Sequence, residues 1–172
     1  MVSGLKLFDL NGKTALITGS SQGIGYALAK GLADAGSDII LNGRNIEKLK
    51  QSAEAINTKQ NIFQLCFDVT DYKQKKRSID KFEKDIKPID ILINNAGMQF
   101  RSPLEDFPPE MFEQLLKTNI SSVFNVSQVV AKYMIKRGEG KIINIASVQT
   151  SLARPGIAPY TATKGAVGNI TK

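Results

Sequence analysis

The sequence has 172 residues and a formal net charge of +7, with 23 Lys and Arg against 16 Asp and Glu. Its hydrophobic share of 42% is ordinary for a globular protein, and the length suffices for one domain with a core. The sequence has no histidine, which excludes Ser-His-Asp hydrolases, histidine-based zinc sites and imidazole acid-base chemistry. Any proton transfer must therefore use Tyr, Lys, Asp or Glu.

The single cysteine, Cys66, excludes a disulfide within the chain and favours a reducing, cytoplasmic compartment. It lies in the apolar stretch 62–67, which predicts a buried, inert thiol. Residues 1–11 lack the apolar core of a signal peptide, and no run approaches the roughly 20 apolar residues that span a bilayer, so we expect a soluble protein. The densest basic run, 73–77, has no interleaved aromatics and predicts a solvated helix face rather than a nucleic-acid contact.

Short apolar runs alternate along the chain with segments of helical periodicity. In chain order, the pattern predicts a strand at 14–18, a helix at 25–35, a strand at 38–41, a helix at 46–57, a strand at 62–67, a helix at 71–86, a strand at 89–93, a helical stretch at 108–137 with one interruption near Asn119, a strand at 141–145 and a helix from about Tyr160. Strands separated by helices pair in parallel through right-handed crossovers. We therefore expect one domain over 1–172, a doubly wound α/β sheet of Rossmann type with five strands.

A glycine-rich turn, 18–25, joins the first predicted strand to the first helix. Glycine permits positive φ and lets a phosphate approach the backbone, where the free N–H groups of the helix start can bind it. The spacing Gly-x-x-x-Gly-x-Gly predicts a nucleotide site, although such glycines also close turns that bind nothing. The residues expected to contact the nucleotide here are Gly19, Ser21, Gly23, Ile24 and Gly25.

The end of the second strand bears on which nucleotide binds. An acid here would accept hydrogen bonds from the ribose of NAD, but the segment 41–45 has none. Arg44 could instead pair with the 2′-phosphate of NADP, or it could be a surface arginine packed on the next helix. The sequence therefore favours NADP over NAD.

Tyr160 and Lys164 are four residues apart at a predicted helix start and so share one face. Tyrosine is a poor base at neutral pH, but a nearby ammonium and the positive end of a helix favour its phenolate. Such a pair can exchange a proton with a carbinol while hydride moves to or from a nicotinamide. Ser147, just after the fifth strand, could hydrogen-bond the substrate oxygen.

Together these residues resemble the short-chain dehydrogenases/reductases along the whole chain. The glycine turn matches, as do Asp68 and Val69 after the third strand, which in the family contact adenine. The segment 94–97 matches the one that lines the cofactor, and this resemblance adds Asn95, Ala96, Gly97, Tyr160 and Lys164 to the cofactor-binding residues.

Asn119, Ser147, Tyr160 and Lys164 fall on the family's catalytic tetrad. The resemblance implies that Tyr160 is the general acid/base, that Ser147 orients the substrate oxygen, and that Lys164 holds the nicotinamide ribose. It further implies that Asn119 interrupts its helix and holds a water in a proton relay, and that no metal takes part.

Within the family, the segments 42–45, 97–104 and 147–160 look like gluconate 5-dehydrogenases, which interconvert gluconate and 5-ketogluconate, commonly with NADP. The residues expected to bind substrate are Ser147, Gln149, Arg154 and Tyr160, while Gln99 and Arg101 could also suit a polyhydroxy acid. A 3-oxoacyl reductase or another sugar-alcohol dehydrogenase is the alternative.

Family members continue for roughly another half-domain, with two further strands and a substrate-covering loop, so we expect the domain to be incomplete at its C-terminal end. The fifth strand would then leave an uncovered sheet edge. Full-length relatives form homo-oligomers, and assembly of this chain is left open. An inactive dinucleotide-binding remnant remains as a further alternative, although the intact tetrad favours a piece of an active enzyme.

Overall fold

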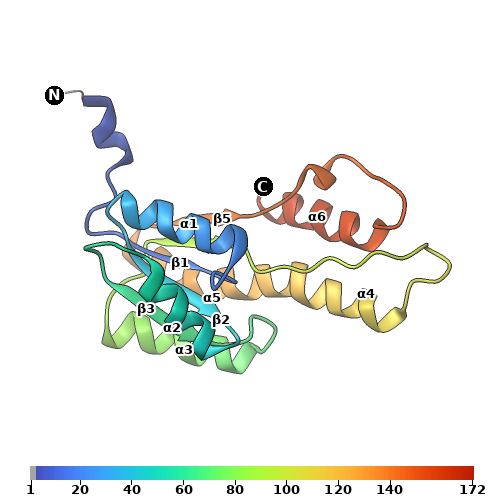
Figure 1. The fold of residues 1–172 in the computed structure, drawn as a ribbon, viewed down its shortest axis with the longest axis horizontal. Helices are drawn as coiled ribbons and strands as arrows, with labels where there is room; N and C mark the ends of the chain where they lie inside the picture. The colour runs from blue at the N-terminus through green and yellow to red at the C-terminus, as the bar shows by residue number, and fades with distance from the viewer. Residues whose placement is uncertain (1–2) are drawn as a thin grey trace.

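The computed structural model describes residues 3–172, with side chains from Lys6 onward. A five-stranded parallel sheet forms its centre (Figure 1). The strands are β1 (Thr14–Ile17), β2 (Asp38–Gly43), β3 (Ile62–Cys66), β4 (Ile91–Asn94) and β5 (Lys141–Asn144), in the order β3-β2-β1-β4-β5. The predicted doubly wound sheet of five strands is confirmed. Its order reverses between β1 and β4, where ligands bind in open α/β sheets.

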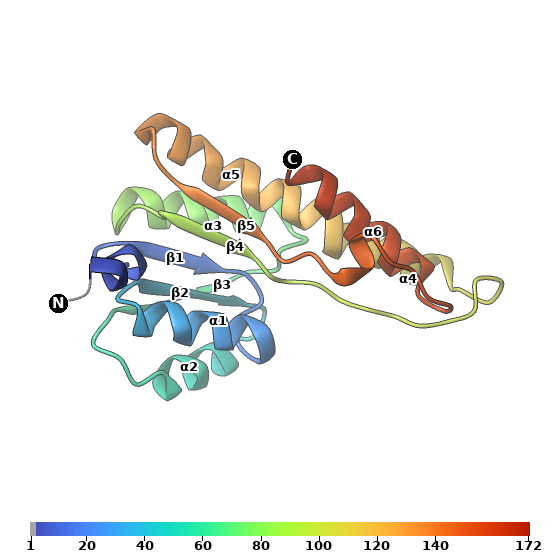
Figure 2. The same cartoon turned by 90° about the horizontal axis from the view of Figure 1, so that it is seen from above.

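Helices cover both faces of the sheet (Figure 2). One face carries α1 (Gly23–Asp34) and α2 (Ile46–Ala55), and the other carries α3 (Tyr72–Asp85) and α5 (Ser122–Arg137). Between α3 and α5 the chain forms α4 (Pro109–Leu116) and the π-helical turn η2 (Lys117–Ser121), and after β5 come η3 (Val148–Thr150) and α6 (Ala158–Ile170). The short helix η1 (Ser3–Phe8) precedes β1 and has no apolar period that could have predicted it. No helix among residues 3–172 is both long and apolar enough to cross a membrane.

The central strands β1 and β4 are apolar except for one terminal residue each, because both of their faces are covered. Every residue of β1 and β4 is buried. Alternate side chains enter two separate cores: Leu16 packs toward α3 and α5, whereas Ala15 and Ile17 pack toward α1 and α2. The period of two therefore fixes which layer each strand residue supports.

Local sequence sets the helix boundaries. Asn45 Oδ1 accepts a hydrogen bond from Lys48 N at 3.0 Å and begins α2, and Asp71 does the same for α3 through Gln74 N at 3.0 Å. Gly138 ends α5 in the left-handed conformation, with φ of 77°. The interruption predicted near Asn119 is confirmed as η2, and π-helical turns of this kind occur often at functional sites.

Two expectations about burial are wrong. Lys75, in the basic run predicted to be solvated, is fully buried, because the helical period places it on the face of α3 that also holds Ile79 and Phe82. Cys66 is only partly buried, because β3 is an edge strand whose residues are all only partly covered. At the opposite edge of the described sheet β5 pairs only with β4, and Ile143 is exposed there, so the expected uncovered edge is confirmed.

Candidate functional site

A cleft of about 690 Å³ lies where the carboxyl ends of β1 to β4 meet. Its walls come from the loops after these strands and from the junction of α4 with η2. The residues predicted to bind the nucleotide that line this cleft are Gly19, Ser21, Gly23, Arg44, Asp68, Val69, Asn95, Ala96 and Gly97. Further lining residues are Gln22, Asn42, Gly43, Phe67, Thr70, Met98, Gln114, Lys117 and Thr118. Segments far apart in the sequence therefore converge on one hollow.

The glycine turn leaves open backbone at one end of this cleft. Gly19 and Gly23 have φ of +64° and +60°, a region that side chains other than glycine rarely adopt. A Cβ on Gly19 would lie 3.0 Å from Cα of Ala96. Within the described part of the chain, no side chain caps the start of α1, which begins at Gly23. Its first N–H groups are therefore free for an anion, with the helix dipole adding to the attraction.

Two residues of the same turn lie elsewhere. Ile24 is 68% exposed and does not line the cleft. Gly25 also lies outside the lining, and a Cβ there would meet both Asn95 Nδ2 and Gly19 O at 2.5 Å. The close packing of α1 against the turn therefore explains this glycine without any ligand contact.

A buried polar network holds the turn in place, and sequence reasoning missed two of its members. Thr18 Oγ1 accepts hydrogen bonds from the backbone N–H groups of Asn95 and Ala96, each at 3.0 Å. Asn42, 1% exposed, accepts from Gly19 N at 3.3 Å and donates to Phe67 O at 3.1 Å. Both residues are polar side chains at the ends of otherwise apolar strands, which is the signal that could have identified them.

Arg44 stands at the rim of the cleft. Its side chain is 82% exposed, and its Nη1 lies 4.0 Å from Asp68 Oδ2. Burial raises the pKa of Asp68, but hydrogen bonds from Thr70 N and Thr70 Oγ1, both 2.8 Å, and the Arg44 charge outweigh it and hold the pKa below its ordinary value. Asp68 is thus an anchored carboxylate, and Arg44 is an exposed cation beside it.

The buried Lys75 supports the same loop from beneath. Its Nζ donates a hydrogen bond to the carbonyl of Val69 at 2.7 Å, and burial lowers the pKa of its ammonium. A lysine on the buried face of α3 therefore fixes the backbone that follows Asp68. Only the helical period of its position, matched with Ile79 and Phe82, could have indicated this from the sequence.

The four predicted catalytic residues are brought together by the packing of η2, η3 and α6. Asn119, 1% exposed in η2, donates to Met98 O at 2.9 Å and to Thr163 Oγ1 at 3.1 Å. Thr163 Oγ1 in turn donates to the carbonyl of Tyr160 at 2.7 Å. Asn119 is thereby tied to the first turn of α6, which carries the tyrosine.

Lys164 and Ser147 are joined through Thr150. Thr150 Oγ1 donates to the Lys164 carbonyl at 3.2 Å, and the backbone N of Ser147 donates to Thr150 Oγ1 at 3.4 Å. Lys164 Nζ donates to Ile145 O at 2.6 Å and lies 5.8 Å from the centre of the Tyr160 ring. Burial lowers the pKa of the Lys164 ammonium. Thr150 and Thr163 are polar links between the predicted residues that sequence reasoning missed.

Of the four residues predicted to bind substrate, only Arg154 lines a second hollow, and Ser147 and Tyr160 lie outside its lining. This hollow, about 640 Å³, is formed by the segments 101–105 and 154–158 and includes both Arg101 and Arg154. The backbone N of Ser102 donates to Gly156 O at 3.1 Å and joins the two segments. Gln149 does not line the hollow, and its buried Oε1 has no partner among the described residues.

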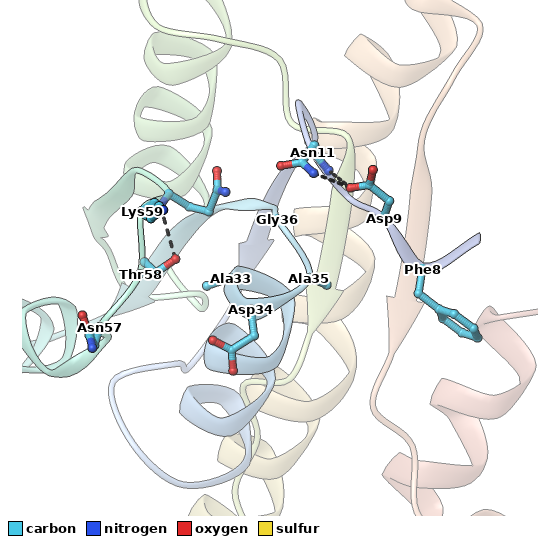
Figure 3. Close-up of a pocket in the computed structure, with 11 residues that line it drawn as sticks. Phe8, Asp9, Asn11, Ala33, Asp34, Ala35, Gly36, Asn57, Thr58 and Lys59 are labelled. Carbon is cyan, nitrogen blue, oxygen red and sulfur yellow. Dashed lines mark hydrogen bonds between the residues drawn. The ribbon is translucent and has the colours of Figure 1, made fainter. Parts of the chain in front are cut away.

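A third hollow of about 530 Å³ lies on another part of the surface (Figure 3). It is bounded by Phe8 to Asn11, by the end of α1 and by residues 57–60 before β3. These segments precede β1, β2 and β3, so the hollow lies at the amino ends of these strands, whereas the glycine turn follows the carboxyl end of β1. None of the predicted site residues lines it.

Comparisons with known proteins agree with this geometry. Residues 13–172 match the family model described as short chain dehydrogenase. A gluconate 5-dehydrogenase from Gluconobacter oxydans (strain 621H) is 53% identical over 171 residues, which cover 96% of this chain and 65% of the relative. A 5-keto-D-gluconate 5-reductase from Escherichia coli (strain K12) is 43% identical over 168 residues, covering 96% of this chain and 66% of the relative.

A solved structure gives the same result. The crystal structure of a gluconate 5-dehydrogenase from Burkholderia cenocepacia J2315 in complex with NADP and tartrate superposes with a TM-score of 0.92 at 49% identity, covering 98% of this chain and 66% of that one. The chain thus spans about 65% of the length of the first of these relatives. On the sequence match, the sheet order and the shared fold, the chain belongs to the short-chain dehydrogenase family.

Proposed function

We propose that the chain is the nucleotide-binding and catalytic part of an NADP-dependent oxidoreductase that interconverts a secondary alcohol and a ketone, with gluconate and 5-ketogluconate as the substrate pair. The observation that carries this proposal is the grouping of three residues beyond a cleft with the glycine turn and Arg44 at its walls. Asn119 is tied to the Tyr160 carbonyl through Thr163, and Lys164 Nζ lies 5.8 Å from the Tyr160 ring. The names of the relatives support the substrate pair.

The cleft fits the nucleotide. The open backbone at Gly19 and Gly23, where a Cβ would be strained, suits a pyrophosphate beside the uncapped start of α1. The Arg44 guanidinium is exposed, and its contact with Asp68 is long, at 4.0 Å. It can therefore turn to a 2′-phosphate and bind it through two hydrogen bonds. The relative from Burkholderia cenocepacia was solved with NADP, which agrees with this choice.

The chain's own residues would move the proton while the bound nicotinamide supplies or accepts the hydride. Tyr160 would exchange a proton at the substrate oxygen, and Ser147 would hold that oxygen by a hydrogen bond. The Lys164 ammonium has three N–H groups, of which one is donated to Ile145 O, so two remain to stabilise the Tyr160 phenolate and hold a ribose. Asn119, fixed by Met98 and Thr163, would keep the proton path in place.

The substrate's carboxylate would meet the arginines beside this group. Arg101 and Arg154 line one hollow from two segments, and their guanidinium groups suit a carboxylate of a polyhydroxy acid. We extend the proposal to Gln149, whose buried Oε1 has no partner among residues 3–172 and could accept from a sugar hydroxyl. With one cysteine in the sequence and no internal disulfide possible, a reducing, cytoplasmic location fits the proposal.

The cofactor is tested by fluorescence titration of the chain with NADPH and NADH, repeated for Arg44→Ala. We expect tighter binding of NADPH, and Arg44→Ala should weaken NADPH by roughly 10- to 100-fold, because a charge-assisted bond to phosphate is lost. Binding of NADH should change little. Equal weakening of both nucleotides would contradict the assigned role of Arg44, and no binding of either would refute a nucleotide site in this chain.

The chemistry is tested by turnover of gluconate with NADP in wild type and Tyr160→Phe. The variant should lose at least roughly 100-fold in turnover while its NADPH affinity stays within about twofold, since the hydroxyl that it lacks acts in proton transfer at the substrate oxygen. A 3-oxoacyl thioester serves as the second substrate. Preference for the thioester would move the substrate to the acyl class, and a wild type that binds NADPH but turns over neither substrate would indicate an inactive chain.

A further inference from the structure

Lys117 is a cation of the cleft that the sequence did not single out. It is the first residue of η2, and it lines the cleft together with Gln114 and Thr118. Arg44 reaches the same cleft from the loop between β2 and α2. Two cations thus enter one hollow from separate walls.

The charge of Lys117 acts on the acid beside Arg44. Burial raises the pKa of the Asp68 carboxyl, and the Thr70 hydrogen bonds lower it. The charges of Arg44 and Lys117 also help to lower this pKa. The Lys117 backbone is hydrogen-bonded within its helix, but among the described residues its side chain makes no hydrogen bond and no ion pair, so its ammonium is available to a ligand or to Asp68. The third nearby cation, Lys75, is committed to the Val69 carbonyl below the cleft floor.

The net charge at this end of the cleft determines how strongly it attracts an anion. Arg44 and Asp68 alone cancel, and a phosphate approaching Arg44 would also be repelled by the carboxylate 4.0 Å away. Lys117 adds one positive charge to the same cleft, from the η2 wall. With it, the acid can be compensated by Lys117 while the guanidinium turns to the phosphate.

We propose that Lys117 is a specificity-determining residue for the 2′-phosphate of the nucleotide, acting by compensating Asp68 and so releasing Arg44. The proposal rests on the proposed function, since it assumes a 2′-phosphorylated adenosine in the cleft. Lys117 is therefore expected to strengthen binding of a 2′-phosphorylated adenosine and to leave binding of the unphosphorylated adenosine unchanged.

The test uses two fragments that differ only in that phosphate, adenosine 2′,5′-bisphosphate and AMP, measured by calorimetry on the full chain. Lys117→Gln removes the charge, Lys117→Arg keeps it, and Lys136→Gln is the matched control, an exposed lysine in the last turn of α5 with the same change of net charge. We expect Lys117→Gln to weaken the bisphosphate roughly five- to tenfold and AMP by less than about twofold. Lys117→Arg and Lys136→Gln should bind both fragments as wild type does.

Equal weakening of both fragments by Lys117→Gln, or no weakening of either, would overturn the proposal. A further arm adds Asp68→Asn: with the carboxylate neutral, Lys117→Gln should change the ratio of the two affinities by less than about twofold. An undiminished change in that background would refute compensation of Asp68. If wild type binds neither fragment, the proposed function is refuted together with this inference. If Arg44→Ala loses the preference for the bisphosphate over AMP but Lys117→Gln keeps it, only the inference is refuted.

Discussion

Gly25→Ala should destabilise the fold although alanine is the better helix former. The added Cβ would lie 2.5 Å from Asn95 Nδ2, 2.5 Å from Gly19 O and 2.9 Å from Ser20 Cα. Two of these contacts are backbone atoms that cannot move aside cheaply, and such overpacking costs about 1–3 kcal/mol. Pushing the Asn95 amide away also breaks its bonds to Thr18 O and Gly19 O, at 2.9 and 3.0 Å.

Each of those hydrogen bonds contributes about 1 kcal/mol, while replacing Gly by Ala in a helix gains back about 1 kcal/mol. The expected net loss for Gly25→Ala is therefore about 2–4 kcal/mol. In a chain of this size that lowers the melting temperature by roughly 4–16 °C. Urea unfolding followed by circular dichroism measures the free energy of unfolding directly.

Gly31→Ala in the same helix is the matched control. A Cβ there meets nothing within 4 Å, and the position is exposed. We expect it to stabilise the chain by about 0.5–1 kcal/mol through helix propensity alone. If Gly25→Ala were as stable as wild type, close approach would not be the reason for glycine at this position. A comparable loss in Gly31→Ala would show that helix glycines matter here for another reason.

Two further predictions concern buried polar groups. Burial raises the pKa of Asp38, but the ion pair with Lys87 and the hydrogen bonds from Asn61 N and Nδ2, at 2.8 and 3.2 Å, outweigh it and lower that pKa. The stabilisation from Asp38 is therefore present above the ordinary carboxyl pKa and is lost as the pH falls through the folded-state value. Asp38→Asn should cost about 2 kcal/mol at pH 7 and progressively less as the pH falls below the ordinary carboxyl pKa, and a loss independent of pH in urea titrations would contradict this. Thr163→Val removes an acceptor of Asn119 Nδ2 and should cost about 1–3 kcal/mol of the free energy of unfolding. The control is Thr161→Val, which should be neutral or stabilising because the buried Thr161 Oγ1 has no partner among the described residues. The same loss in both variants would rule out the Asn119 bond as the cause.

The fold and much of the candidate site were predictable from the sequence, because their causes are local. Runs of apolar residues bounded by glycine or polar residues specified each strand to within about two residues at either end. Gly19 and Gly23 were identifiable because positive φ restricts the choice of residue. The order of Ser147, Tyr160 and Lys164 after one strand indicated the candidate catalytic group, since a strand end and a helix start fix their positions.

Tertiary structure alone decided which surface each side chain meets. Lys75 and Lys117 are both lysines in polar stretches, yet one is buried under Val69 and the other lines the cleft. Gly25 belongs to the same motif as Gly19, but the approach of Asn95 from a distant loop determines its role. These assignments depend on contacts between segments separated by tens of residues. A local pattern fixes the direction of a side chain on its own helix or strand, but only packing fixes what stands opposite it.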